Sequence, residues 1–333
     1  MTNTNNCRRA AIFGCTSTVL TSQEKSFFAK ANPFGLILFD RNIKNAEQIR
    51  ALCSELRDCV GWYMPIFIDQ EGGRVQRLRS PLVKEWPAPL DHADMYGEDA
   101  HKVIYGRYYL IAQELRDLGI TANCAPVADI SRPKTHEVLK NRCFGRDELS
   151  VSRLARAAAN GLLNGGVLPV VKHIPGHGLA QVDSHQEAPV VYIAKLELSK
   201  SDFMPFKAMN YLPMAMTGHV IYKEIDIKPG TVSKKIIKLI RNEIGFDGLL
   251  LSDDLSMQAL GGTIIERAEA VIDAGCDIVL HCNGDMDEML KIIDVIGEMN
   301  YNSQLRAEKV ITLHNSLSGI KIDLQRAYAQ FTT

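Results

Sequence analysis

The segment Val167-Leu168-Pro169-Val170-Val171-Lys172-His173, continued by Ile174-Pro175-Gly176-His177-Gly178, is an apolar run that ends in basic side chains and then breaks. The apolar run predicts a buried strand over 168–173. The proline and glycines that follow cannot extend a strand or a helix. Lysine and histidine side chains are therefore delivered to a loop at one strand's end. Because proteins place chemistry on loops held by a rigid scaffold, this segment indicates an enzyme.

Similar short apolar runs recur along the chain, and longer amphipathic stretches lie between most of them. The predicted strands are 11–14, 36–39, 66–69, 122–127, 168–173, 214–219, 249–253 and 277–281, and the predicted helices are 46–60, 100–118, 151–163, 234–244 and 264–274. Eight strands that alternate with helices over one domain length predict an α/β fold, a (β/α)8 TIM-like barrel. We expect residues 1–333 to form a single domain with a helical tail from about 300 to 333.

A doubly wound open sheet is the structural alternative. No Gly-x-Gly-x-x-Gly segment follows an early strand, which counts against it. Hydrogen-bonding or ionisable residues follow most of the predicted strands, where a barrel carries its active site. These residues include Asp40, Asp69, Asp129, His219 and Asp253. The pattern predicts a polar pocket at that end of the barrel.

Composition is that of an ordinary globular protein, with 46% hydrophobic and 23% charged residues in a chain of 333. A net charge of -1 gives no reason to expect nucleic acid or an anionic membrane as partner. The eight cysteines are scattered, so we expect reduced thiols and no disulfide framework. No convincing signal peptide or bilayer-length apolar run is present. We therefore expect a cytoplasmic protein, and a monomer.

The run Leu249-Leu250-Leu251 ends in Ser252-Asp253-Asp254, which places a carboxylate at the mouth of the barrel. Asp253 is a candidate nucleophile, general base or metal ligand. The simpler role for Asp254 is to cap the helix that follows.

A second candidate segment runs from Asp69 through Glu71-Gly72-Gly73 to Arg74 and Arg77. Asp69 ends a predicted strand, and the two glycines let the backbone turn close to a ligand. Arg74 and Arg77 are three residues apart, so only one of them needs to face inward. An inward guanidinium would suit a hydroxyl-rich or anionic substrate.

The loop after His173 carries His177, Asp183 and His185. One serine separates Asp183 from His185, so the carboxylate could orient that imidazole and raise its basicity. A histidine paired in this way can act as general acid and base near neutral pH. His177 lies between glycines, and either a functional role or a bracing role fits it. A metal centre is not expected, because Pro175 and Gly176 interrupt the spacing of His173 and His177.

Together these motifs resemble glycoside hydrolase family 3, in particular its single-domain bacterial β-N-acetylhexosaminidases. The matching strings run in the family's order from about residue 35 to 283: Gly35–Phe39, Asp69–Arg77, Ala125–Val127, Asn141–Gly145, Lys172–His185 and Gly245–Met257. The resemblance implies a retaining mechanism, with Asp253 as nucleophile and His185 as acid and base, partnered by Asp183. It also implies that five residues bind the terminal sugar: Asp69, Arg77, Arg142, Lys172 and His173.

The resemblance further implies the removal of N-acetylglucosamine from muropeptide fragments during cell-wall recycling, without a cofactor. A β-glucosidase or a glycoside phosphorylase on the same barrel is the nearest alternative. A sugar-binding module that has lost catalysis is less consistent with the sequence, since both Asp253 and His185 are present. A metal-dependent hydrolase is a further alternative, and chelators would inactivate it. Sequence assigns no role to Arg146 or His219, and it does not define the leaving group.

Overall fold

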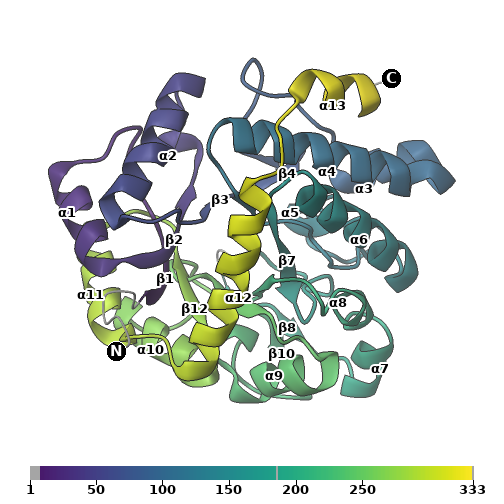
Figure 1. Cartoon of the computed structure of the whole chain (residues 1–333). Helices are drawn as coiled ribbons and strands as arrows, with labels where there is room; N and C mark the ends of the chain where they lie inside the picture. Colours follow the sequence, from purple (N-terminus) through teal and green to yellow (C-terminus); the bar gives the residue numbers. More distant parts are fainter. Residues whose placement is uncertain (1–7, 185–186, 332–333) are drawn as a thin grey trace.

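The computed structural model describes residues 8–184 and 187–331, and within these ranges eight parallel strands close into a barrel (Figure 1). Each strand pairs with the next along the chain, and the last pairs with the first. The strands are β1 (Arg9–Gly14), β2 (Pro33–Leu38), β3 (Ile66–Ile68), β6 (Ala122–Asn123), β7 (Leu168–Ile174), β9 (Met214–Thr217), β11 (Leu249–Asp254) and β12 (Ile278–His281). The predicted barrel is confirmed, and the open doubly wound sheet is excluded.

Helices connect the strands on the outside of the barrel. They are α1 (Ser22–Ala31), α2 (Ala46–Val60), α3 (Pro89–Tyr96), α4 (Ala100–Asp117), α5 (Glu137–Lys140), α6 (Glu148–Asn164), α7 (Lys195–Lys200), α8 (Met204–Ala208), α9 (Lys234–Leu239), α10 (Ile264–Ala274) and α11 (Met286–Ile296). The predicted bounds of α2 and α10 agree with the structure at both ends. The predicted helix 234–244 is α9 continued by a π turn, Ile240–Ile244. Helices α7 and α8 lie in a connection for which the sequence analysis predicted none.

Local sequence explains where several helices begin and end. Thr21 accepts a hydrogen bond from the backbone of Glu24, whose side chain accepts one from the backbone of Thr21, so α1 opens with a capping box. Gly61 ends α2 in the left-handed conformation, with φ of 73°. The barrel strands themselves are almost wholly buried, which fits near-continuous apolar runs in a parallel sheet.

The end of the described chain is helical, with α12 (Tyr301–Ser318) and α13 (Leu324–Phe331). Helix α12 passes across the barrel and contacts β11 (Figure 1). Helix α13 packs on α4, where Phe331 lies so close to Gly106 that a Cβ there would be 2.3 Å from its ring. Tyr328 donates a hydrogen bond to Glu114 of α4. These contacts fix the tail against the body of the barrel.

Closure of the barrel is reinforced at its C-terminal end by Arg41, in the turn after β2. Its guanidinium donates to the carbonyl oxygen of Cys15 at 2.9 Å and also to that of Cys282. Cys15 follows β1 and Cys282 follows β12, so one side chain bridges the seam between the first and last strands. Gly14 is required beside it, because a Cβ at this position would be 2.2 Å from the Cys282 carbonyl oxygen.

All seven cysteines within the described ranges are free, as expected for reduced thiols. Of the helices in the described part of the chain, none has the length and apolar character to cross a lipid bilayer.

Candidate active site

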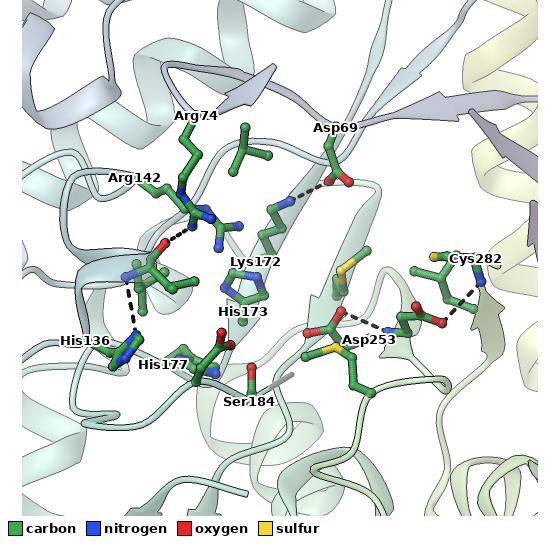
Figure 2. Close-up of a pocket in the computed structure, with 18 of the residues that line it drawn as sticks. Asp69, Arg74, His136, Arg142, Lys172, His173, His177, Ser184, Asp253 and Cys282 are labelled. Carbon is green, nitrogen blue, oxygen red and sulfur yellow. Dashed lines mark hydrogen bonds and ion pairs between the residues drawn. The ribbon is translucent and has the colours of Figure 1, made fainter. Parts of the chain in front are cut away.

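A cavity of about 270 Å³ opens at the C-terminal ends of the barrel strands (Figure 2). Its walls carry side chains from β2, β7, β9, β11 and β12 and from the segments that follow β3, β6 and β7. All of the predicted site residues that the structure describes line this one cavity: Asp69, Arg77, Arg142, Lys172, His173, Asp183 and Asp253. The barrel therefore brings together residues that are up to 184 positions apart in the sequence, from Asp69 to Asp253.

Asp69 accepts hydrogen bonds from two cations. The Nη2 atom of Arg77 lies 3.1 Å from one carboxylate oxygen, and Nζ of Lys172 lies 2.8 Å from the other. Burial alone would raise the pKa of the Asp69 carboxyl, but the charges of Lys172 and Arg77 outweigh it and lower that pKa far below its ordinary value. Asp69 is therefore ionised at neutral pH. Arg74 and Arg77 both line the cavity, but only Arg77 contacts Asp69, whereas Arg74 donates to the carbonyl oxygen of Val138.

Glu71 forms the second acidic centre, and it is buried behind the cavity wall with 1% exposure. Arg142 donates two hydrogen bonds to its carboxylate, from Nε and Nη2, both at 2.8 Å. Lys172 lies between the two acids, with its Nζ 2.7 Å from Glu71. Burial would raise the pKa of Glu71, yet Arg142 and Lys172 lower it to about 2. Glu71 was not among the predicted site residues.

Asp253 stands at the end of β11, where its carboxylate faces the cavity (Figure 2). The backbone N–H of Asp254 donates to its Oδ1 at 2.9 Å. Burial would raise the pKa of Asp253, but the nearby imidazoles of His219 and His173 reverse the shift and lower it. The carboxylate is therefore ionised and available as a nucleophile at neutral pH.

Asp254 does not cap a helix, contrary to expectation, because a turn and not a helix follows β11. It accepts hydrogen bonds from the backbone N–H groups of Ser256 and Cys282, at 3.1 Å each. It thus holds the turn and ties β11 to the end of β12. His219 is completely buried between Thr231 and the carbonyl oxygen of Asp254, and this position supports the turn beside Asp253.

His173 is held from behind by Asp129, a second residue to which the sequence analysis gave no role beyond its polarity. Nδ1 of His173 lies 2.7 Å from Oδ2 of Asp129, and Oδ1 accepts the backbone N–H of His177 at 2.7 Å. One buried carboxylate thereby orients the imidazole and also anchors the start of the following loop. The ring of His177 lies beside that of His173, and burial lowers its pKa to about 4, so it is neutral. His177 also lines the cavity, beside His173.

The loop after His177 continues to Asp183 and Ser184, which both line the cavity. Gly178 permits its path, since a Cβ there would be 2.1 Å from the carbonyl oxygen of Ile130. His185, the predicted acid and base, lies outside the described residues, so its partnership with Asp183 stays a prediction. Arg146 does not line this cavity; it forms a two-point contact with Asp94 on the surface. Within the described ranges, no three His, Cys, Asp or Glu side chains are arranged to hold a metal ion.

A closed (β/α)8 barrel with ionised carboxylates and fixed cations in one cavity at its C-terminal end defines an enzyme that acts on a small, hydroxyl-rich molecule. Residues 16–313 match the model of the Glycosyl hydrolase family 3 N terminal domain. The chain belongs to glycosyl hydrolase family 3, and it is a glycoside hydrolase.

Individual relatives agree with this assignment. A protein of Bordetella avium named beta-hexosaminidase is 37% identical over 272 residues, covering 79% of this chain and 77% of that protein. One of the same name from Psychromonas ingrahamii is 34% identical over 303 residues, covering 87% and 88%. The crystal structure of native NagZ from Neisseria gonorrhoeae is 32% identical with a TM-score of 0.85, covering 97% of this chain and 96% of that one. The same protein in complex with N-trifluoroacetyl-D-glucosamine gives 31% and 0.86, covering 98% and 97%.

Proposed function

We propose that the protein is a retaining exo-β-N-acetylglucosaminidase that uses a covalent glycosyl-enzyme intermediate. The observation that carries the proposal is the ionised Asp253 at the end of β11, facing the same cavity as the Asp69, Lys172 and Arg77 contacts. The relatives named beta-hexosaminidase and the complex with N-trifluoroacetyl-D-glucosamine support the choice of sugar. The cavity volume of about 270 Å³ is small for a ligand pocket and suits one terminal sugar ring.

In this proposal the terminal sugar binds through its hydroxyl groups. Asp69 accepts hydrogen bonds from hydroxyls, while Arg77, Arg142 and Lys172 donate them. His173 adds a ring nitrogen, because Asp129 takes up only Nδ1 and leaves Nε2 on the cavity side. Such an array orients the ring so that its anomeric carbon faces Asp253, and the correct orientation lowers the entropic part of the barrier.

The chemistry then proceeds in two displacements. A carboxylate oxygen of Asp253 attacks the anomeric carbon, the bond to the leaving oxygen breaks, and His185 gives that oxygen its proton. The product of this step is a glycosyl ester on Asp253. In the second displacement His185 takes a proton from water, the water oxygen attacks the anomeric carbon, and the carboxylate leaves. Retaining enzymes ordinarily divide these roles between two carboxylates, so the histidine is the distinctive part of this proposal.

We further propose that the natural substrates are muropeptide fragments that carry a terminal N-acetylglucosamine, and that the protein works in the cytoplasm as a monomer. Support for the substrate comes from the resemblance of the Lys172–His185 and Gly245–Met257 strings to the bacterial hexosaminidases. A purified fragment of this kind should be cleaved to free N-acetylglucosamine, with the anomeric configuration retained in the first product. Proton nuclear magnetic resonance during the first minutes of reaction distinguishes the anomers. Initial release of the inverted anomer would reject the covalent mechanism.

The test of the sugar is a paired assay with 4-nitrophenyl β-N-acetylglucosaminide and the matching β-glucoside, without added phosphate. The proposal expects release from the first substrate and little from the second. Preference for the glucoside would replace the substrate while keeping the fold. Turnover only after phosphate is added, with formation of a sugar 1-phosphate, would favour the phosphorylase alternative. A sugar-binding module would bind N-acetylglucosamine and release nothing under any of these conditions.

A further inference from the structure

We propose that Glu71 is a positioning residue for sugar binding: its buried carboxylate fixes Arg142 and Lys172 so that their remaining N–H groups face the substrate. This inference rests on the proposed function, which places both cations on the sugar. Glu71 itself has only 1% exposure and is not among the residues that line the cavity, whereas Arg142 and Lys172 are. Its effect on substrate is therefore exerted through the two cations.

The contact with Arg142 determines the direction of the guanidinium. Because Nε and Nη2 both donate to Glu71 at 2.8 Å, the planar group is fixed in the plane of the carboxylate. Those two donors lie on one edge of the guanidinium, so its other edge is directed away from Glu71. The side chain of Arg142 is 12% exposed and lines the cavity. Figure 2 shows Arg142 and Lys172 on the same side of the cavity, opposite Asp253.

Lys172 is fixed by a related argument. Its Nζ carries three N–H groups in a tetrahedral arrangement. One of them donates to Asp69 at 2.8 Å, and the ammonium also forms an ion pair with Glu71 at 2.7 Å. The two contacts hold the ammonium between the two carboxylates and restrict the directions of its other N–H groups. A lysine held by Asp69 alone could rotate about one hydrogen bond, and its third donor would have no defined direction. Glu71 therefore converts a flexible ammonium into an oriented donor.

Glu71 is itself anchored from the rear by helix α4. Its carbonyl oxygen accepts hydrogen bonds from the Tyr108 hydroxyl at 3.0 Å and from the Arg107 guanidinium. Gly72, with φ of 103°, brings the chain so close that a Cβ there would be 1.8 Å from Nη2 of Arg107. Arg107 and Tyr108 are both buried, at 1% and 0% exposure. The carboxylate thus stands on a rigid base, as positioning of other side chains requires.

Charge balance adds a second reason for the presence of an acid here. Lys172 and Arg142 are both bound to one carboxylate, and Arg77 lies on the neighbouring acid, Asp69. Without the charge of Glu71, these three cations would face Asp69 alone. The expected response is that Arg142 turns away from Lys172, because like charges repel strongly in a poorly hydrated cavity. Loss of Glu71 would consequently disorder the sugar-binding donors while leaving Asp253 in place.

The decisive variant is Glu71→Gln, which keeps the size of the side chain and removes its charge. Donors lost from ground state and transition state alike raise KM with little change in kcat. We expect KM for 4-nitrophenyl β-N-acetylglucosaminide to rise about 10- to 100-fold, with kcat reduced several-fold at most. The inhibition constant of free N-acetylglucosamine should rise by a similar factor. Glu71→Asp, which keeps the charge but is too short to reach both cations, should give a smaller rise.

The matched control is Asp277→Asn. Asp277 is also a buried carboxylate with two arginine partners, but it precedes β12 at the opposite end of the barrel. It should lower the melting temperature without changing KM. If Glu71→Gln lowers the melting temperature and leaves KM and the inhibition constant unchanged, Glu71 is merely structural and the inference is overturned. If Glu71→Gln fails to fold, an unchanged KM in Glu71→Asp overturns the inference in its place.

The wild-type assay separates this inference from the proposed function. Failure of the wild-type protein to cleave the N-acetylglucosaminide would reject the proposed sugar. The ratio of KM between Glu71→Gln and wild type would then be measured on the glycoside that is cleaved. A ratio near one on that substrate would reject the positioning role as well.

Discussion

At each end of the barrel, one buried carboxylate binds two cationic side chains, but the two clusters are built differently. At the C-terminal end, Glu71 binds Arg142 and Lys172, whose other donors reach a cavity. At the other end, Asp277 binds Arg241 at 2.6 Å and Arg306 at 3.2 Å. Ser303 and the backbone N–H of Leu250 also donate to Asp277, at 2.7 and 2.8 Å.

The difference lies in what the cations do with their remaining donors. Arg241 gives them to the carbonyl oxygens of Phe246 and Gly248, and Arg306 contacts Asp247. That cluster is satisfied within the protein and ties α12 to β11 and β12. The cluster around Glu71 has donors that substrate hydroxyls can satisfy. In our proposal, the same ion-pair chemistry thus stabilises the fold at one end and positions sugar-binding donors at the other.

The largest expected effect belongs to the C-terminal end. Asp253→Ala removes the proposed nucleophile, so turnover of the aryl N-acetylglucosaminide should fall by about 10⁴-fold or more. Steady-state rates measure this loss, and thermal unfolding in parallel checks the fold. We expect the melting temperature to stay the same or rise, because a buried charge has been removed. Residual activity within tenfold of wild type would show that Asp253 is not the nucleophile.

His185→Ala should depend on the leaving group. General acid catalysis contributes about 10²- to 10⁴-fold, so cleavage of a natural disaccharide fragment should fall by that factor. A 4-nitrophenyl leaving group needs little protonation, and its departure should be affected far less. Values of kcat/KM on both substrates report the first displacement alone, and they give the comparison when measured with the same enzyme preparation. Equal losses on the two would reject His185 as the acid.

Asp277→Asn addresses the other end of the barrel. It leaves Arg241 and Arg306 without their shared buried charge, and we expect the free energy of unfolding to fall by about 3 kcal/mol. Chemical denaturation measures that change. KM and kcat at a temperature where the variant is folded should match wild type. A raised KM would mean that the two ends are coupled, and the contrast between them would fail.

The smallest effect concerns pH and His314 of α12. Its ring is stacked on that of Tyr63 with centroids 4.6 Å apart, and burial lowers the pKa of His314 from 6.5 to about 4. In the unfolded chain His314 is protonated below about pH 6.5, whereas in the folded protein it stays neutral down to about pH 4. The free energy of unfolding therefore falls as the pH falls through this window. His314→Phe keeps the stack and removes the proton. From pH 7 to pH 5, the free energy of unfolding of the wild-type protein should fall by up to about 2 kcal/mol more than that of His314→Phe.

Denaturation curves at both pH values measure that difference. A wild-type protein and a His314→Phe variant with the same pH dependence would mean that His314 is not buried in its neutral form.

The carboxylates at the C-terminal end affect stability only at lower pH. Glu71 has a pKa near 2 when folded, so the stability that it contributes is present above its ordinary pKa and disappears only in strong acid.

The fold was predictable because its determinants are local and repeated. Each barrel strand is an apolar run that can be recognised without its partners, and helices such as α2 and α10 carry their own periodicity and end at a glycine. Helices α3, α5, α7, α8 and α11 were missed. The helices α5, α7 and α8 have only 4, 6 and 5 residues, too few for a periodic pattern to develop. Helix α11 has 11 residues and was missed although its length allows a periodic pattern.

The site was predictable to the extent that barrels place function at strand ends. That rule, together with the family resemblance, led to Asp69, Lys172 and Asp253. Glu71 and Asp129 escaped because their roles depend on cations and imidazoles that come from other strands. For Glu71 the only signal was an acid two residues after Asp69, and for Asp129 it was a position after a predicted strand. Asp254 was misassigned for the same reason, since its partner at Cys282 is remote in sequence.

The seam that Arg41 bridges has a consequence for how the enzyme is made. Because β1 pairs with β12, the ribosome must produce most of the chain before the ring can close. Asp69 and Asp253 reach the same cavity only in the closed ring, so a nascent chain lacks the complete constellation until its final strand is in place. Newly synthesised molecules should therefore gain catalysis in one late step. Catalytic activity therefore reports how many newly made chains have closed the barrel.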